Sequence, residues 1–419
     1  MSGTGPQASD APAVAAPASK AAVIFIFITV LLDVLALGII IPVGPHLIVQ
    51  LDGSDFAHAS EVSGLFGFTF ALMQFIFSPV VGMLSDRVGR RPVVLMSNLG
   101  LGADYLVMAL APTLSWLFVA RMVSGITAAS VSTAFAYISD TTEPEKRAQK
   151  FGLIGAAFGL GFVIGPAIGG TLGQIDLRLP FYVAASLSLV NFTYGFFILP
   201  ESLPKERRTP FDLKRANPLG SLQLLSSSPV VLGLAVASFC AFLAHEALPA
   251  IFVLYAAQRY GWTQRDVGLM LAGVGVASSV VQGGLIRPAV RKLGERMALM
   301  VGLTCGLLSF VIYGISPTGL LLLLGIPFGA FWGLWGPSSQ AMMTRELPAN
   351  QQGKFQGALS SLRGISGMLG PILYTQAFAF AVASGGFVGL PFLVGALMLG
   401  VAVVLVLVTL RRAKAPVPA

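Results

Sequence analysis

Residues 82–92, Gly-Met-Leu-Ser-Asp-Arg-Val-Gly-Arg-Arg-Pro, form a short charged segment between two long apolar stretches. Gly82 and Gly89 permit a tight turn, because glycine has no Cβ that would clash with the backbone. Cytoplasmic loops of membrane proteins are commonly basic, which accounts for the arginines but not for the spacing of the glycines and the acid. The segment therefore predicts a specialised turn between two membrane helices, built from Gly82, Asp86, Arg87, Gly89, Arg90 and Arg91.

Composition places most of the chain in a membrane. Of its 419 residues, 55% are hydrophobic and 11% are charged, and the mean hydropathy is +0.82, whereas soluble domains contain about 25% charged residues. A helix needs about 20 apolar residues to cross the hydrocarbon core. We therefore predict an all-α polytopic membrane protein with twelve transmembrane helices, near residues 22–45, 60–81, 93–111, 114–138, 149–172, 180–199, 228–252, 266–286, 297–316, 318–342, 354–382 and 387–410.

The basic residues predict the orientation. Of the 26 Lys and Arg, 21 lie in the two termini and in the loops that follow even-numbered spans. Both termini are therefore expected in the cytoplasm, where positively charged loops are retained. The net charge of +8 then needs no nucleic acid partner to explain it.

The chain divides into two similar halves. A long polar segment at 200–227 separates the predicted spans six and six. We expect a disordered cytoplasmic tail at 1–20, six-helix bundles at 21–199 and 228–410, a cytoplasmic linker at 200–227 and a cytoplasmic tail at 411–419. The halves echo each other, since three residues recur 204 positions later: Pro144, Lys150 and Phe151 as Pro348, Lys354 and Phe355. Parallel six-helix halves of this kind place a substrate site between them, near the bilayer midplane.

Three further segments carry a family resemblance. They are Leu32–Pro42 with its early Asp33, Arg121–Ala129 with the sequence Arg-Met-Val-Ser-Gly, and Gly161–Gly170 with the pattern G-x-x-x-G-P-x-x-G-G. Together with residues 82–92, they resemble the signatures of the major facilitator superfamily. Within it, the chain is most similar to the twelve-span drug:proton antiporters, and among these to the tetracycline efflux pumps.

The resemblance implies two pseudo-symmetric bundles that alternate in exposing a central site, and export of a drug in exchange for protons across the bacterial cytoplasmic (inner) membrane. Asp33 matches the acid early in the first span, and Arg121 matches the arginine linked to proton coupling. The residues expected to control gating are those of the 82–92 turn together with Gly161, Gly165, Pro166, Gly169 and Gly170.

The second half departs from the tetracycline pumps. Those pumps carry an acid in the ninth span, where this chain has Cys305-Gly306, and a histidine in the eighth span, where this chain has none. This chain instead has His245 and Glu246 in the seventh span, before a break expected at Pro249, and Arg363 in the eleventh. Because of this difference, we still expect a drug exporter, but the sequence does not decide whether tetracycline is its substrate.

Charges inside spans are expensive, at about 2.5–3.5 kcal/mol each on insertion scales, so each one predicts a function. Arg363 is expected near the bilayer middle, where it either pairs with Glu246 or meets an anionic group of the substrate. Asp104, in a peripheral span, is expected to be a hydrogen-bonded packing carboxyl. The predicted proton-coupling residues are Asp33, Arg121, His245 and Glu246.

Aromatic and polar residues of the central spans are expected to complete an apolar pocket, in which a few polar groups orient the ligand. The predicted substrate-binding residues are Asp33, Gln74, Phe75, Tyr137, Phe242, Glu246, Trp332, Trp335, Gln340 and Arg363.

The sequence thus predicts a proton-coupled antiporter that exports amphipathic small molecules, either tetracycline-like compounds or a broader range of drugs. The alternative is a proton-coupled transporter of one specific metabolite, anionic or not. No nucleophile–base pair or metal-ligand cluster falls in the loops, so we expect neither an enzyme nor a bound metal or cofactor. The expected partners are the substrate, protons and the lipid bilayer, and we expect a monomer.

Overall fold

The computed structural model describes residues 20–53, 55–128, 130–142, 144–211, 219–348 and 351–412, and within these ranges the chain is helical, without a β-strand. The helices of the first half are α1 (Lys20–Ile40), α2 (Gly44–Asp52), α3 (Phe56–Val88), α4 (Arg90–Leu110), α5 (Leu114–Thr127), α6 (Ser130–Thr141), α7 (Pro144–Ile175) and α8 (Leu179–Ile198). Those of the second half are α9 (Pro229–His245), α10 (Ala247–Tyr260), α11 (Gln264–Val280), α12 (Ile286–Ile315), α13 (Gly319–Leu322), α14 (Gly325–Trp332), α15 (Trp335–Arg345), α16 (Gln352–Ala383) and α17 (Leu390–Arg412).

The number of membrane crossings follows from helix length. Ten helical segments of the described chain are long and apolar enough to cross a membrane, and α1 with α2 supplies an eleventh, bent by 43°. One of the ten, Gln264–Ile315, has 52 residues, more than twice the length that one crossing needs. It is interrupted at Gly294, whose φ of 74° and ψ of 160° are not helical. Counted as two crossings, it brings the described helices to the predicted twelve.

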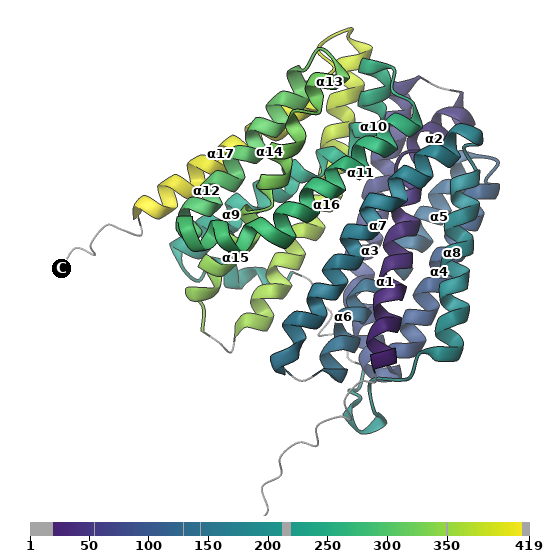
Figure 1. The fold of residues 1–419 in the computed structure, drawn as a ribbon, viewed down its shortest axis with the longest axis vertical. Helices are drawn as coiled ribbons and strands as arrows, with labels where there is room; N and C mark the ends of the chain where they lie inside the picture. The colour runs from purple at the N-terminus through teal and green to yellow at the C-terminus, as the bar shows by residue number, and fades with distance from the viewer. Residues whose placement is uncertain are drawn as a thin grey trace, which may run out of the picture.

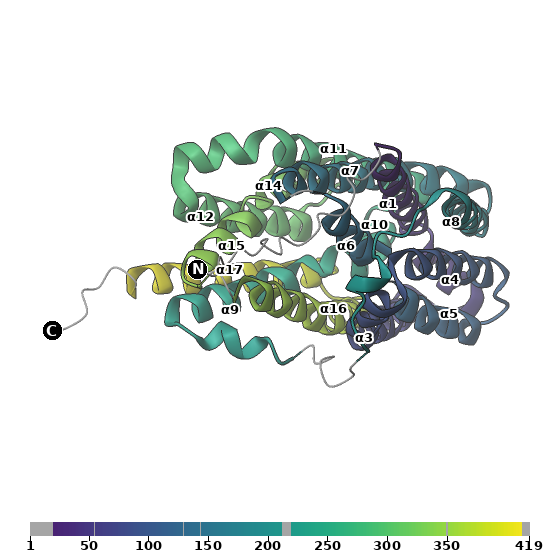
Figure 2. The same cartoon turned by 90° about the horizontal axis from the view of Figure 1, so that it is seen from below.

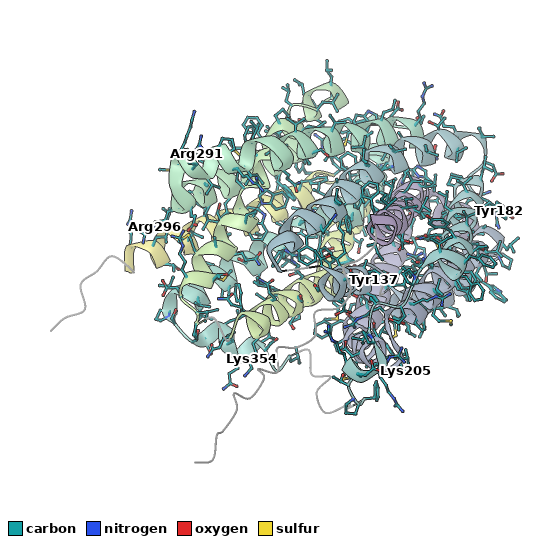
Figure 3. The ribbon with its side chains drawn as sticks, turned by 60° about the horizontal axis from the view of Figure 1, so that its bottom comes forward. Tyr137, Tyr182, Lys205, Arg291, Arg296 and Lys354 are labelled. Atoms are coloured by element: carbon teal, nitrogen blue, oxygen red, sulfur yellow. The ribbon has the colours of Figure 1, made fainter. Side chains whose placement is uncertain are left out.

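Two bundles lie side by side, with α1–α8 in one and α9–α17 in the other (Figures 1 and 2). Across their boundary, α3 packs against α16 and α7 packs against α11. We call the end with the turns at Gly89 and Gly294 the basic end; Lys205, Arg291, Arg296 and Lys354 lie around it (Figure 3). The opposite end, with the turns at Gly53 and Gly261, is the distal end.

The bundles approach each other closely in the distal part of the boundary and separate toward the basic end. A Cβ added at Gly67 of α3 would lie 2.9 Å from the Pro371 side chain of α16. Nearer the basic end, a Cβ added at Gly82 of α3 or Gly152 of α7 would meet no neighbouring helix of the described chain within 4 Å. Among the described residues, the boundary is therefore wider near the basic end than in its distal part.

The glycines of residues 161–170 serve two helix contacts. Gly161, Gly165 and Gly169 face α1 of the same bundle, and an added Cβ at each would overlap α1. Gly170 faces the other bundle, at the Gln264 backbone of α11. Small residues let helices approach closely, so this segment mainly fixes α7 to α1 and meets the second bundle at its distal end.

Candidate functional site

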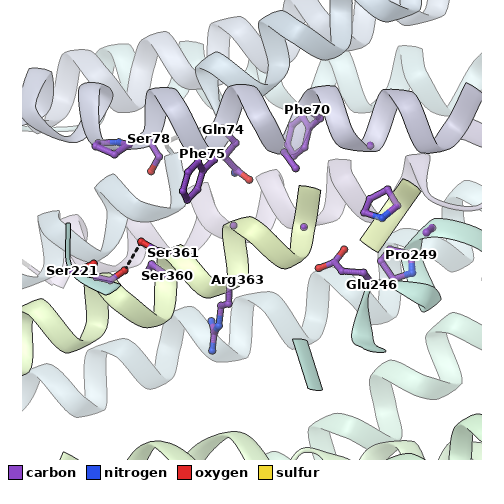
Figure 4. Close-up of a pocket in the computed structure, with 18 of the residues that line it drawn as sticks. Phe70, Gln74, Phe75, Ser78, Ser221, Glu246, Pro249, Ser360, Ser361 and Arg363 are labelled. Carbon is purple, nitrogen blue, oxygen red and sulfur yellow. Dashed lines mark hydrogen bonds between the residues drawn. The ribbon is translucent and has the colours of Figure 1, made fainter. Parts of the chain in front are cut away.

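A cavity of about 960 Å³ lies between the bundles, with α3 along one wall and α16 along the other. Gly353 and Lys354, at the start of α16, line it at the basic end. Pro45 of α2 and Glu246, at the α9–α10 junction, line its inner end. Figure 4 shows Glu246 and Arg363 on the side of the cavity opposite the α3 residues. The cavity therefore reaches from the basic end to the middle of the molecule.

Glu246 stands at the junction of α9 and α10, with φ −64° and ψ −18°. The sequence predicted the break at Pro249, and the structure places it three residues earlier. The reason is that proline lacks an N–H, and its ring collides with the carbonyl four residues before it, here that of His245. Gly370 of α16 accommodates the acid, because an added Cβ there would overlap the Glu246 side chain.

Arg363 of α16 is solvent-exposed although it lies in a membrane helix, so it faces the cavity rather than lipid. Its guanidinium carbon lies 4.8 Å from the centroid of the Phe242 ring, a cation–π distance. Phe242 in turn contacts Trp335 edge to face, with ring centroids 5.1 Å apart. In the described part of the chain, Arg363 forms no ion pair with Glu246, so of the two alternatives for Arg363 the pairing is not observed.

His245 precedes Glu246 but points toward a different neighbour. Its ring centroid lies 5.5 Å from that of Trp332 on α14. Adjacent positions on a helix are about 100° apart around its axis, which is why the two ionisable groups diverge. His245 therefore does not line the cavity wall formed by α3 and α16.

The other predicted pocket residues fall into four groups. Gln74 and Phe75 line the cavity. Phe242, Trp332 and Trp335 form an aromatic layer behind Arg363 and His245, and Gln340 of α15 is half-buried away from the cavity. The remaining two, Asp33 and Tyr137, are buried within the first bundle.

Asp33 and Tyr137, which the sequence analysis expected to bind substrate, are not among the residues that line this cavity. Asp33 lies on the face of α1 that packs against α8, and its Oδ1 accepts a hydrogen bond of 3.2 Å from Asn191. The Tyr137 hydroxyl donates to the Pro200 carbonyl at 3.2 Å. The apolar pattern of α1 has no clear single face, which is why the sequence did not indicate that Asp33 turns away from the cavity.

Arg121 forms a buried ion pair that the sequence did not predict. Its Nη2 lies 3.1 Å from Asp104 Oδ2, and the Asp104 side chain is fully buried. The guanidinium also lies 5.8 Å from the Phe70 ring of α3. Asp104 is thus the partner of the motif arginine, in addition to being the packing carboxyl that we expected.

The turn after α3 is held by Arg90. Its guanidinium forms ion pairs with Asp86 at 2.6 Å and with Asp140 of α6 at 2.8 Å. A third carboxylate, Glu201, comes from the segment that follows α8 and accepts hydrogen bonds from the backbone N–H groups of Arg90 and Arg91 at 2.8 and 3.3 Å. Glu201 therefore caps the first turn of α4, where the N–H groups have no partner within the helix.

The second bundle repeats this ion pair with its charges exchanged. Glu295 and Arg345 stand 205 residues after Arg90 and Asp140, and they pair at 2.7 Å. Sequence reasoning missed Asp140, Glu201 and Arg345, although the fixed offset between the halves could have indicated the last pair. Within the described ranges, no three His, Cys, Asp or Glu side chains are grouped so that they could hold a metal ion.

A cavity between two pseudo-symmetric helix bundles, with ionisable groups from membrane-spanning helices on its wall, is the architecture of secondary transporters. The chain belongs to the Major Facilitator Superfamily, whose family model matches residues 26–371. The resemblance drawn from the sequence is therefore confirmed.

Two relatives support the same conclusion over most of the chain. The class C tetracycline resistance protein of Escherichia coli is 36% identical over 381 residues, which cover 90% of this chain and 94% of that protein. The class D tetracycline resistance protein of Salmonella ordonez is 33% identical over 404 residues, which cover 96% and 99%.

Solved structures share the fold. The human organic anion transporter MFSD10 (TETRAN) superposes with a TM-score of 0.70 and 25% identity, covering 93% of this chain and all of that one. A bacterial homologue of the human lysosomal transporter Spinster, in an inward-facing and unoccupied conformation, has a TM-score of 0.77 and 16% identity, with 96% and 100% covered.

Proposed function

We propose that this protein is a proton-coupled antiporter that exports amphipathic small molecules by alternating access. The observation that carries the proposal is the cavity of about 960 Å³ between the bundles, with Glu246 and Arg363 on its wall. The similarity to tetracycline resistance proteins supports a drug as the exported molecule.

The basic end faces the cytoplasm in this proposal. Lys205, Arg291, Arg296 and Lys354 lie around that end, and positively charged loops are retained in the cytoplasm. Both termini are then cytoplasmic, the membrane is the bacterial inner membrane, and the structure is in the state that loads substrate from inside. The units that rock are residues 21–199 and 228–410, joined by the 200–227 linker, and the working unit is a monomer.

Proton coupling is assigned to Asp33, Arg121, His245 and Glu246. Among them, Glu246 lines the cavity, so its carboxylate can hold either a proton or a cationic group of the substrate. Exchange follows if the two facing states bind the proton with different affinity. Asp33 lies in the first bundle, where its carboxyl group accepts a hydrogen bond from the Asn191 side chain.

Substrate binding is assigned to Gln74, Phe75, Glu246 and Arg363, with Phe242, Trp332 and Trp335 as the aromatic layer behind them. Gating is assigned to the 82–92 turn, in which Arg90 holds Asp86 and Asp140, and to the glycines of residues 161–170. Closure at the basic end would bring Asp86 toward the N-terminus of α16, whose partial positive charge attracts a carboxylate.

The test is transport in proteoliposomes of purified protein under an imposed pH gradient, with a panel of cationic, anionic, zwitterionic and neutral amphipathic compounds. Uptake of at least one compound that depends on the gradient and disappears with a protonophore is the expected result. Gradient-independent uptake, or uptake equal to that of protein-free liposomes for every compound, would refute the proposal.

A second candidate is a transporter of one anionic metabolite. It is favoured by the two cationic side chains on the cavity, Arg363 and Lys354. The same panel separates the two functions, since this candidate predicts tight binding of one acid and little transport of cationic drugs.

A further inference from the structure

The cavity is lined by two ionisable side chains of opposite sign that do not pair with each other. Glu246 and Arg363 both line it, and neither has an ion-pair partner among the described residues. Arg363 rests on the Phe242 ring instead. Burying a charge without a partner is costly, so each side chain favours a ligand group of the opposite sign once the cavity closes and water leaves.

The helix geometry sets the spacing of the two positions on α16 that the charged side chains adjoin. The Glu246 side chain lies against Gly370 of α16, and Arg363 is seven residues earlier on the same helix. At 1.5 Å per residue this separates the two positions by about 10 Å along α16. Gly364 and Gly367 lie between them along α16, facing Phe75 and Ala71 of α3, and residues 364–369 include no charged side chain.

The charges also have an order along the cavity. Glu246 is at the inner end, Arg363 is closer to the basic end, and Lys354 lies at the mouth, nine residues further along α16. Another polar group lies near the acid: the hydroxyl of Tyr374, a fully buried residue, has no hydrogen-bond partner among the residues that the structure describes, and it interacts electrostatically with Glu246. The inner end, with Glu246 and the Tyr374 hydroxyl, thus favours a cationic group of a ligand. The outer part, with Arg363 and Lys354, favours an anionic group.

We propose that the site selects zwitterionic amphipathic ligands, with an ammonium group on Glu246 and a carboxylate-like group on Arg363, joined by an apolar body that spans the separation of about 10 Å along α16. This inference rests on the proposed function, because it specifies the substrate class of the same cavity. A ligand with one charge leaves either Glu246 or Arg363 unpaired in the closed site, and truncating one partner of such a pair weakens binding strongly. Protonation of Glu246 would release the ammonium group, which links this selectivity to exchange.

The experiment is equilibrium binding to the purified full-length protein, read by the fluorescence of the tryptophans near Arg363 and His245. The probe is a biphenyl with an aminomethyl group at one end and a carboxylate at the other. Three relatives are compared with it: its methyl ester, which is only cationic, its N-acetyl derivative, which is only anionic, and para-(aminomethyl)benzoate, in which the same charges are closer together. We expect the biphenyl zwitterion to bind at least about tenfold tighter than each of the three.

Two variants assign the ends of the ligand. Glu246→Gln should remove the preference for the zwitterion over the N-acetyl compound and keep its preference over the ester, and Arg363→Gln should do the opposite. Matched controls are Glu206→Gln and Arg291→Gln, which make the same changes at exposed positions outside the cavity and should alter neither preference. Elution of each variant as a single species shows that it is folded.

Equal binding of the zwitterion and its ester by the wild type, or equal weakening of all four ligands by both cavity variants, would overturn the inference. Since binding is measured without a gradient, this outcome is distinct from failure of the proposed function, which shows as absent proton-driven transport. If a variant does not fold, the ligand series on the wild-type protein alone still decides the question.

Discussion

Gly89 and Glu201 offer the sharpest test of how the turn after α3 is built. Gly89 has φ 112° and ψ 163°, a conformation that side chains disfavour, and an added Cβ would overlap the Glu201 carboxylate. Gly89→Ala therefore has two effects: backbone strain of about 2 kcal/mol, and displacement of the acid that caps α4. Loss of a helix cap lowers stability by about 1 kcal/mol, so Gly89→Ala should destabilise the folded protein by about 3 kcal/mol in total.

The double variant separates these effects. Glu201→Ala alone removes the hydrogen bonds to the backbone of Arg90 and Arg91, at a cost of about 1 kcal/mol. In a protein that already lacks the Glu201 side chain, Gly89→Ala adds only the backbone strain. The double variant should therefore lose about 3 kcal/mol of stability, whereas additive effects would give about 4 kcal/mol, and the difference is a coupling energy of about 1 kcal/mol.

Hydrogen exchange of the first turn of α4 measures this directly, since local opening sets the exchange rate. Glu201→Ala is expected to raise exchange there about fivefold, as a change of about 1 kcal/mol implies. Glu206→Ala, an exposed acid on the same segment, is the control and should leave exchange unchanged. Strictly additive variants, or unchanged protection of α4 in Glu201→Ala, would refute this account of the turn.

Three further predictions concern single carboxylates. Asp33→Asn removes a titratable group between α1 and α8, so proton-driven export in proteoliposomes should stop while the protein still elutes as one folded species. Export at the wild-type rate would show that Asp33 does not take part in proton coupling. Asp104→Asn leaves the Arg121 guanidinium without its partner and should cost about 3 kcal/mol, seen as a lower midpoint of unfolding in detergent. Adding Arg121→Gln should recover most of that loss, and additive losses would contradict the pairing. Asp86→Asn should favour the state open at the basic end, because the closed state loses a carboxylate facing the start of α16; labelling of a cysteine at Ser360 should rise, and an unchanged pattern would count against this role.

Much of the fold could be predicted from the sequence because membrane helices are set by local composition. The predicted spans 60–81 and 354–382 lie inside α3 (Phe56–Val88) and α16 (Gln352–Ala383). The helices extend beyond the apolar runs, since their ends project into the interface and need no apolar side chains. Breaks were harder to place: Pro249 indicated that the seventh span is interrupted, while the interruption itself stands at Glu246, where the clash with a carbonyl four residues earlier puts it.

The sequence predicted a cavity with charged and aromatic side chains, but it did not predict correctly which of those side chains line it. Glu246, Arg363, Gln74 and Phe75 line the cavity as the sequence suggested. Asp33 does not, because a charge in an apolar helix shows that a polar neighbourhood must exist without showing on which side of the helix it lies. The neighbourhood is Asn191, 158 residues away in the chain.

By itself, the sequence determined the membrane class, the twelve crossings and the two related halves, because hydrophobic length and motif spacing are properties of the chain alone. Only the tertiary structure decided which charges meet. Arg121 could have faced lipid headgroups, the cavity or an acid, and packing of α5 on α4 brings it to Asp104. Glu246 and Arg363 could have paired. Instead, the Glu246 side chain lies against Gly370 of α16, about two helical turns from Arg363 on that helix. Pairing depends on distances between helices that no local pattern encodes, and a few ångströms separate an ion pair from two open charges.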